Sequence, residues 1–269
     1  MLSALLLISA ALYGLSLLLY LVFLFGRDEG SVRMARAALL AALATHLGLI
    51  GYQCIDGFNP LRDVRGALSL TSWLLGAGFL LLTHRSRMSV LGAFIAPLSL
   101  CLLLASRVTP QAAPAGGDAS GASRALGNLH IFLSATGVAI FALAAAVGLI
   151  YLLQERALKR KQLGRLFRIT PPLTTLDAVG RVLILVGFPL YTLAMGTGVV
   201  WSLQLPDDGG SHRLAHVISL AVWLIFAALI GLRVAVGLRG RRAALLTMAG
   251  FAAAVVVLLL YMLRRMMLV

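Results

Sequence analysis

The chain has 269 residues, of which 61% are hydrophobic and only 12% are charged. Soluble domains have about half apolar and about a quarter charged residues, so this composition excludes an ordinary soluble domain. The formal net charge is +14, but the basic residues gather near the ends of apolar segments, as expected for a membrane protein rather than for a nucleic-acid-binding one.

Eight apolar runs follow one another along the chain. Each is a candidate membrane-spanning helix, since ~20 residues rising ~1.5 Å each cross ~30 Å of hydrocarbon. We predict spans near Leu2–Phe25, Ala35–Asp56, Ala67–Thr83, Ser89–Ala105, Gly127–Gln154, Val182–Trp201, Leu214–Leu232 and Ala243–Leu263. A helix cannot continue through the proline pair Pro171–Pro172, which precedes the sixth run. The sequence therefore predicts an all-α polytopic membrane protein, with residues 1–269 forming a single domain.

The basic residues are distributed unevenly between alternate loops. One set of loops carries 16 of the 23 Lys and Arg residues, and the other set carries 7. Cytoplasmic loops are enriched in Lys and Arg, so the richer set is predicted to be cytoplasmic and both termini to face outward. The first run is predicted to be a retained N-out helix, and some of the charge can contact anionic lipid.

Charged residues are missing from the centres of the predicted spans. All nine carboxylates lie in loops or at helix ends, and the span centres contain no Lys or Arg. Ion-coupled carriers usually need such charges, so this pattern disfavours a carrier. Histidine is therefore the remaining side chain that could bind a ligand inside the membrane.

Three histidines and a tryptophan are predicted to meet at the outer side. His130 opens the fifth span, Trp201 ends the sixth, and His212 and His216 flank the start of the seventh. His46 lies deeper, roughly 15 Å along its helix from Arg36. Imidazole can bind haem iron and aromatic rings can pack on a porphyrin, so His130, Trp201, His216 and His46 are candidate haem-binding residues.

The same residues have structural interpretations. An intramembrane histidine such as His46 commonly hydrogen-bonds a neighbouring helix, and a tryptophan at the interface, such as Trp201, is usually an anchor. The small-residue face below His130, with Gly137 and Gly148, is typical of helix packing. His212, in a turn-forming loop, is most simply solvated. The residues alone leave ligand binding and packing open for His130.

Three segments of the chain resemble a known family. They are LHIFLSATGVAIFALAAAVGLIYLLQERALK, PPLTTLDAVGRVLILVGFPLYTLAMGTGVVW with its terminal Gly-x-x-Trp, and VWLIFAALIGLRVAVGLRGRRAALLTMAGF with its Arg and Gly-x-Arg-Gly-Arg close. Their order and spacing are similar to those of the cytochrome c assembly family of haem-handling membrane proteins, in the CcsA-like, HemX-like and YpjD-like branch. The resemblance runs from His46 to the end of the chain.

The resemblance implies a function. In the family, the histidine that opens the Leu-His helix is an outer ligand of haem iron, and His130 occupies that place. Haem would be the cofactor, bound transiently and presented at the outer face, with apocytochrome c and a second membrane subunit as partners. The resemblance thus implies an assembly factor that is not itself an enzyme.

The chain departs from the family pattern in several places. The tryptophan-rich outer loop is reduced to WSLQLPDDGGSH, Gly231 stands near the position of an intramembrane histidine, and YMLRRMM lacks a second outer histidine. His212 or His216 could replace a lost ligand. These departures keep an alternative open: a regulator or scaffold of haem synthesis or complex assembly that binds no haem and docks through the basic loop 156–168.

Overall fold

The computed structural model describes residues 1–26, 30–57, 59–85, 88–109, 121–161, 164–204 and 211–267. Within these ranges every regular element is a helix. The helices are α1 (Leu2–Phe25), α2 (Gly30–Ile55), α3 (Val64–Arg85), the short 3₁₀ turn η1 (Ser89–Leu91), α4 (Gly92–Val108), α5 (Gly121–Lys159), α6 (Arg165–Ile169), α7 (Leu173–Ser202), α8 (Ser211–Ala235) and α9 (Gly240–Met267).

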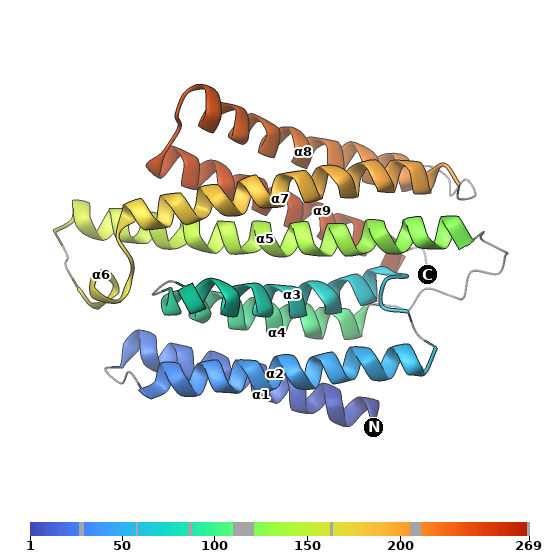
Figure 1. Cartoon of the computed structure of the whole chain (residues 1–269), viewed down its shortest axis with the longest axis horizontal. Helices are drawn as coiled ribbons and strands as arrows, with labels where there is room; N and C mark the ends of the chain where they lie inside the picture. Colours follow the sequence, from blue (N-terminus) through green and yellow to red (C-terminus); the bar gives the residue numbers. More distant parts are fainter. Residues whose placement is uncertain are drawn as a thin grey trace.

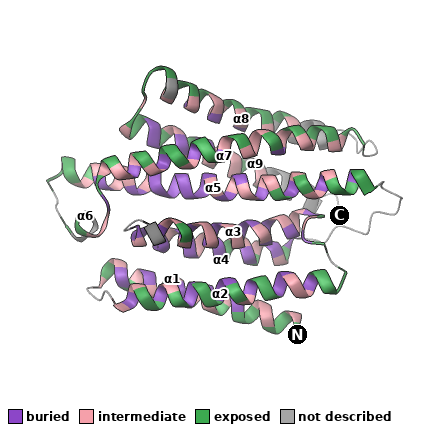
Figure 2. Cartoon of the chain, in the orientation of Figure 1, coloured by how far each residue is buried: buried purple, intermediate pink, exposed green. Residues whose placement is uncertain are grey.

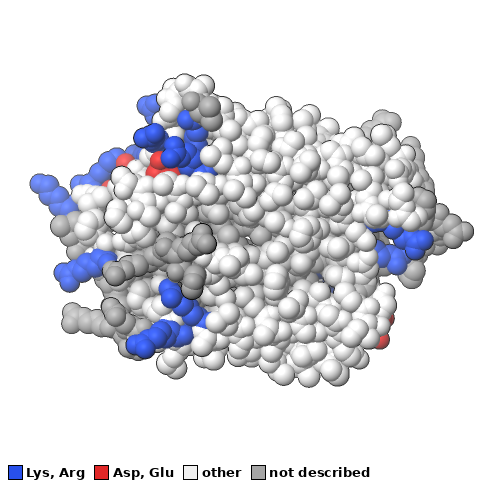
Figure 3. All heavy atoms as spheres, viewed as in Figure 1, with Lys and Arg blue, Asp and Glu red and all other residues white. Residues whose placement is uncertain are grey.

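The long helices lie side by side and run alternately in opposite directions (Figure 1). The most extensive pairings are α5 with α7 and α1 with α2, and α3 packs on both α4 and α5. The two termini lie at the same end of the bundle (Figure 1). Lys and Arg gather most densely at the other end, around the α5–α7 and α8–α9 connections (Figure 3). The connections therefore divide into a basic end and a terminus-bearing end, as the loop charges predict.

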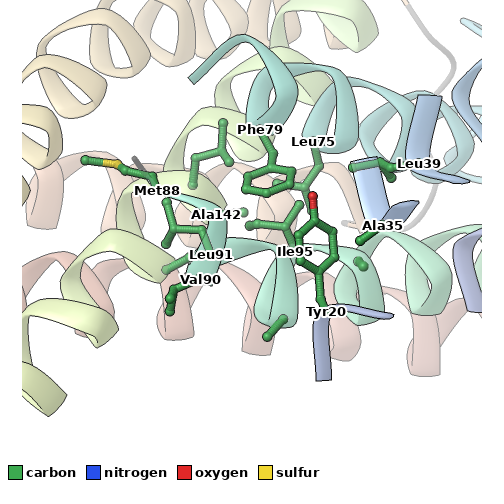
Figure 4. Packing of buried hydrophobic residues seen from close by; sticks show 14 of the residues in the cluster. Tyr20, Ala35, Leu39, Leu75, Phe79, Met88, Val90, Leu91, Ile95 and Ala142 are labelled. Carbon is green, nitrogen blue, oxygen red and sulfur yellow. The ribbon is translucent and has the colours of Figure 1, made fainter. Parts of the chain in front are cut away.

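The first core cluster joins α1–α4 to the inner face of α5 (Figure 4). Tyr20 of α1 is fully buried and packs edge-on against Phe79 of α3, with ring centroids 5.7 Å apart. The ring also lies against Gly92, where a Cβ atom would collide with it. Large aromatic rings opposite glycine let helices of this bundle approach closely.

The second core cluster joins α5 to α7, α8 and α9. Phe141 of α5 stacks on Phe226 of α8 with ring centroids 3.8 Å apart and planes only 8° apart, and meets Tyr191 of α7 edge-on. Aromatic pairs of this kind add specificity to helix packing. α5 takes part in both clusters, and its long run of buried residues passes through the middle of the molecule (Figure 2).

Each predicted span overlaps one long helix of the structure in the same order; α1 has the predicted bounds, and the other helices differ from the prediction at one or both ends. α7 begins at Leu173, directly after Pro172 at its N-cap, nine residues before the predicted start at Val182. The five-residue α6 is not predicted by the hydrophobic pattern. α7 contains Pro189 within its length, and α4 contains Pro97. Apolar runs locate the buried middle of a helix, whereas caps and prolines decide its ends.

Six helices among the described residues are long and apolar enough to cross a membrane, namely α1, α2, α3, η1 with α4, α5 and α7. α8 contributes a shorter apolar helix, Ser219–Arg233, by the same criteria. Many large hydrophobic side chains point outward from the bundle, for example Leu18, Leu81 and Leu193. The chain is thus an all-α, multi-pass membrane protein, and eight spans with outward termini stay a prediction.

Candidate functional site

His130 lies in α5 at the terminus-bearing end, where α5 meets α7. Its Nδ1 atom is 2.7 Å from the carbonyl oxygen of Ala194 in α7. A carbonyl oxygen only accepts hydrogen bonds, so Nδ1 must carry the proton and donate it. The Nε2 atom then holds the lone pair, and it has no hydrogen-bond partner among the described residues.

Gly198 of α7 provides the space for the His130 ring. A Cβ atom built on Gly198 would lie 2.6 Å from Cε1 and 2.7 Å from Nδ1 of His130. Such distances are shorter than van der Waals contact, so any larger residue would displace the imidazole. The ring is therefore fixed in two ways, by the hydrogen bond to Ala194 and by contact with the α7 backbone at Gly198.

Trp201 lies one helical turn beyond Gly198 and packs back on α5. Its indole ring is tilted 37° to the His130 ring, with centroids 5.8 Å apart. A Cβ atom on Gly127 would lie 2.8 Å from Cε2 of Trp201. The contact between the two helices is thus reciprocal. The His130 ring of α5 packs on Gly198 of α7, and the Trp201 ring of α7 packs on Gly127 of α5.

His216 lies in the second turn of α8 and is half-buried. It is near enough to His130 for the two imidazoles to interact electrostatically. The side chain of His212 and the loop residues 205–210 lie outside the described residues. Of the predicted outer neighbourhood, the described structure therefore brings together His130, Trp201 and His216.

His46 lies apart from this cluster, in the half of the molecule that contains α1–α4. It is fully buried, and both of its ring nitrogens are hydrogen-bonded, Nδ1 to Tyr13 Oη at 3.2 Å and Nε2 to Ser69 Oγ at 2.9 Å. The Tyr13 ring also packs edge-on against the imidazole. His46 thus links α1, α2 and α3, which is the structural role that its sequence position left open.

The glycines below His130 contact neighbouring helices. A Cβ atom on Gly137 would lie 3.5 Å from Tyr191 Cβ in α7, and one on Gly148 would lie 3.4 Å from the carbonyl oxygen of Ala244 in α9. These are ordinary helix–helix contacts, as expected for small-residue faces in membranes. The predicted helix-packing role of this face is confirmed.

Two parts of the site are not among the predicted site residues, the carbonyl of Ala194 and Gly198. A backbone carbonyl leaves no trace in the sequence. Gly198 does leave one, because it stands three residues before Trp201 in the Gly-x-x-Trp motif, and residues three apart share a helix face. The Gly-x-x-Trp motif therefore places a glycine and an aromatic ring together on the face of α7 that packs on α5.

The donor set suits haem better than a bare metal ion. No group of three or more His, Cys, Asp or Glu side chains gathers to hold a metal among the residues that the structure describes. Haem iron already has four porphyrin nitrogens and needs only one or two axial ligands from the protein. One oriented imidazole beside an indole, with a second imidazole in electrostatic range, fits that requirement at His130.

The fold and this site define the chain as a multi-pass helical membrane protein that holds one oriented imidazole between its two most closely packed helices. It belongs to the cytochrome c assembly protein family, whose model matches residues 61–268. The match includes α5 and α7, which hold His130, and α8 and α9, which complete the second core cluster.

Several curated proteins are similar to most of the chain. Protein HemX of Bacillus subtilis is 23% identical over 241 residues, which are 89% of this chain and 87% of HemX. The cytochrome c biogenesis protein CcsA of Guillardia theta is 24% identical over 250 residues, covering 86% and 83% of the two chains. An uncharacterized 28.8 kDa protein of Azospirillum brasilense is 30% identical over 190 residues, covering 68% and 69%. No solved structure matches the chain.

Proposed function

We propose that the protein is a haem-handling factor of cytochrome c biogenesis in the bacterial inner membrane. It would span the membrane eight times as one domain, with both termini outward, and would bind haem at the outer face and present it to apocytochrome c. The family and the similarity to CcsA support a role in cytochrome c biogenesis. The basic end, lying opposite the termini, supports the orientation because Lys and Arg favour the cytoplasmic side.

One observation carries the proposal: the orientation of the His130 ring. The hydrogen bond from Nδ1 to Ala194 fixes the tautomer whose free lone pair lies on Nε2. Histidines that bind metals commonly donate their other ring N–H to a carbonyl or carboxylate, which orients the ring and raises its basicity. His130 already has this arrangement, so binding iron through Nε2 would need no loss of a protein hydrogen bond.

The other residues of the proposed site have distinct roles. Trp201 would pack beside the bound haem and hold the imidazole in place, and His216 would be a second histidine available to the iron. His46 is placed outside the site in this proposal, because ligation would break one of its two hydrogen bonds. Haem would supply the group to be attached to the apocytochrome, and a second membrane subunit would be needed for that attachment, so the chain itself makes no covalent bond.

Absorption spectroscopy of the purified protein tests the proposal. The wild type should retain haem with a Soret band, and His130→Ala should lose most of it. His84→Ala, at the other end of α3 from the site, is the matched control and should leave the band unchanged. His216→Ala should move the band or weaken it, since a change of axial ligand alters the iron spectrum. A Soret band that survives in His130→Ala would remove His130 from the proposed role.

A second candidate function is a regulator or scaffold that binds no haem. The observation that favours it is the exposed basic segment at the end of α5, which includes Arg156, Lys159 and Arg160 and is available for a cytoplasmic partner. A colourless purified protein that retains a partner in a pull-down, and loses it when these three residues are replaced by Gln, would select this function instead.

A further inference from the structure

A cavity of about 350 Å³ lies at the basic end, at the opposite end of α7 from His130. It is lined by the third and fourth turns of α7, the end of α8 and the α8–α9 connection. The lining residues are Arg181, Ile184, Leu185, Ile230, Arg233, Gly237 and Arg239. This volume is within the range of small-ligand sites, at its lower end. The proposed haem function does not use this cavity.

Arg233 is the central polar residue of the cavity. Its side chain is only 6% exposed, and Nη2 lies 3.8 Å from Oδ1 of Asp177. The other two nitrogens, Nε and Nη1, are buried and have no hydrogen-bond partner among the described residues. Buried donors of a charged group are costly when unsatisfied, so two free positions on one guanidinium indicate a missing acceptor.

The charge of the cavity favours an anion. Arg181 interacts electrostatically with Arg233, and Arg239 completes a set of three guanidinium groups. Among the described residues, the carboxylate that interacts with Arg233 is that of Asp177, which also accepts a hydrogen bond from the backbone N–H of Gly240 at 3.2 Å. Arg233 therefore receives only one long contact from Asp177, and the cavity keeps an excess of positive charge. Guanidinium groups match the geometry of phosphate oxygens and can bind them in pairs.

The apolar wall narrows the choice of anion. Ile184 and Ile230 line the cavity from α7 and α8, and Leu185 is 46% exposed on the outer surface of α7. A ligand seated on the arginines would therefore have hydrocarbon surface beside it. Basic pockets between helix ends on the cytoplasmic side are where anionic lipid headgroups bind.

We infer that this cavity binds a phosphate group, carried by an anionic phospholipid whose acyl chain lies along α7 and α8. Nε and Nη1 of Arg233 donate to the phosphate oxygens, and Arg181 and Arg239 close over it from the rim. The free phosphate ion shares this headgroup chemistry, and the acyl contacts with Leu185 and Ile230 distinguish the lipid from it.

The test uses the full chain in a neutral detergent. The probes are short-chain phosphatidylglycerol, phosphatidylcholine with the same acyl chains, and inorganic phosphate. Native mass spectrometry reports the bound lipid, and the midpoint of thermal unfolding reports the stabilisation that a ligand of the folded state produces. We expect one retained phosphatidylglycerol and a raised midpoint, with phosphatidylcholine having little effect. Phosphate alone acting as strongly as phosphatidylglycerol would support the phosphate site and assign the free ion to it.

Three double variants keep the test independent of folding. Arg181→Gln/Arg239→Gln removes two exposed rim charges and should weaken phosphatidylglycerol binding about tenfold, since each basic side chain near an anionic headgroup contributes a several-fold factor. Arg156→Gln/Arg160→Gln removes the same charge from the same end outside the cavity and should bind as the wild type. Arg233→Gln/Asp177→Asn removes the buried pair together and should abolish binding. Equal binding by the rim variant and its control, or by phosphatidylcholine and phosphatidylglycerol, would overturn the inference.

Discussion

His46 in α2 and His130 in α5 are both histidines within long helices, but they differ in how many of their ring nitrogens are hydrogen-bonded. His46 is completely buried and uses both ring nitrogens in hydrogen bonds to Tyr13 and Ser69. His130 is half-buried and uses Nδ1 alone. A polar ring inside a membrane helix needs partners, so the nitrogen left free at His130 sets that residue apart.

The two imidazole rings also differ in what holds them in place. The His46 ring lies among side chains of α1 and α3, which are held to it by polar contacts. The His130 ring lies on a glycine notch of α7, where the backbone itself fixes its plane. Saturation of both nitrogens indicates a structural role, whereas a rigid ring with one free nitrogen is suited to bind a ligand.

The largest effect on stability is expected from His46→Ala. The change removes a buried side chain and leaves Tyr13 Oη and Ser69 Oγ without their partner, which should lower the free energy of unfolding by about 3 kcal/mol. Denaturation of the purified protein in mixed detergent micelles measures this loss. Leu47→Ala, the neighbouring residue, whose side chain is 52% exposed, should cost much less. Loss of haem from folded His46→Ala protein would identify His46 as a haem ligand and contradict the purely structural role that we assign to it.

A smaller effect on stability, with a clear effect on the site, is expected from Gly198→Ala. The new methyl group must push the His130 ring away from α7, at a cost of about 2 kcal/mol, and should reduce haem retention. Gly196→Ala is the control, because a Cβ atom there has no atom within 4 Å outside its own helix segment. That control should be neutral or slightly stabilising, since alanine favours helix over glycine. Equal haem retention by the two variants would show that the notch does not position His130.

The smallest effect is expected from Tyr13→Phe, which removes one hydroxyl and keeps the ring packed against His46. Loss of its hydrogen bond to Nδ1 should lower the free energy of unfolding by about 1 kcal/mol and leave the haem spectrum unchanged. Tyr52→Phe, on the same helix as His46, should have no effect, because the Tyr52 hydroxyl makes no hydrogen bond within the described ranges. A Tyr13→Phe variant as stable as this control would mean that Nδ1 of His46 is not satisfied by Tyr13.

The helices and their order could be predicted from the sequence because the apolar runs are long and well separated. Leu2–Phe25 has the predicted bounds, since the chain changes from apolar to charged within a few residues. α5 extends to Gly121 and Lys159, beyond both predicted ends, because polar residues at helix ends are stable outside a hydrocarbon layer. Hydropathy identifies the segment of a helix that lies in lipid, whereas the helix itself can extend beyond that segment.

The site could be predicted in part. The loop parity places His130, Trp201 and His216 on one side, and the structure brings those three together. The partners of His46 could not be predicted, because Tyr13 and Ser69 come from other helices and only tertiary packing selects them. The cavity around Arg233 has the same origin, since its arginines are spread over two helices and a connection.

Pro189 joins the two functional ends that we propose for α7. It lies between the cavity residues Arg181 and Leu185 and the site residues Ala194 and Gly198. Proline has no N–H to donate, so the carbonyl oxygen of Leu185 lacks the hydrogen bond that it would normally accept from residue 189. A helix bends most easily at such a point. One missing backbone hydrogen bond therefore separates the half of α7 that lines the cavity from the half that holds the imidazole.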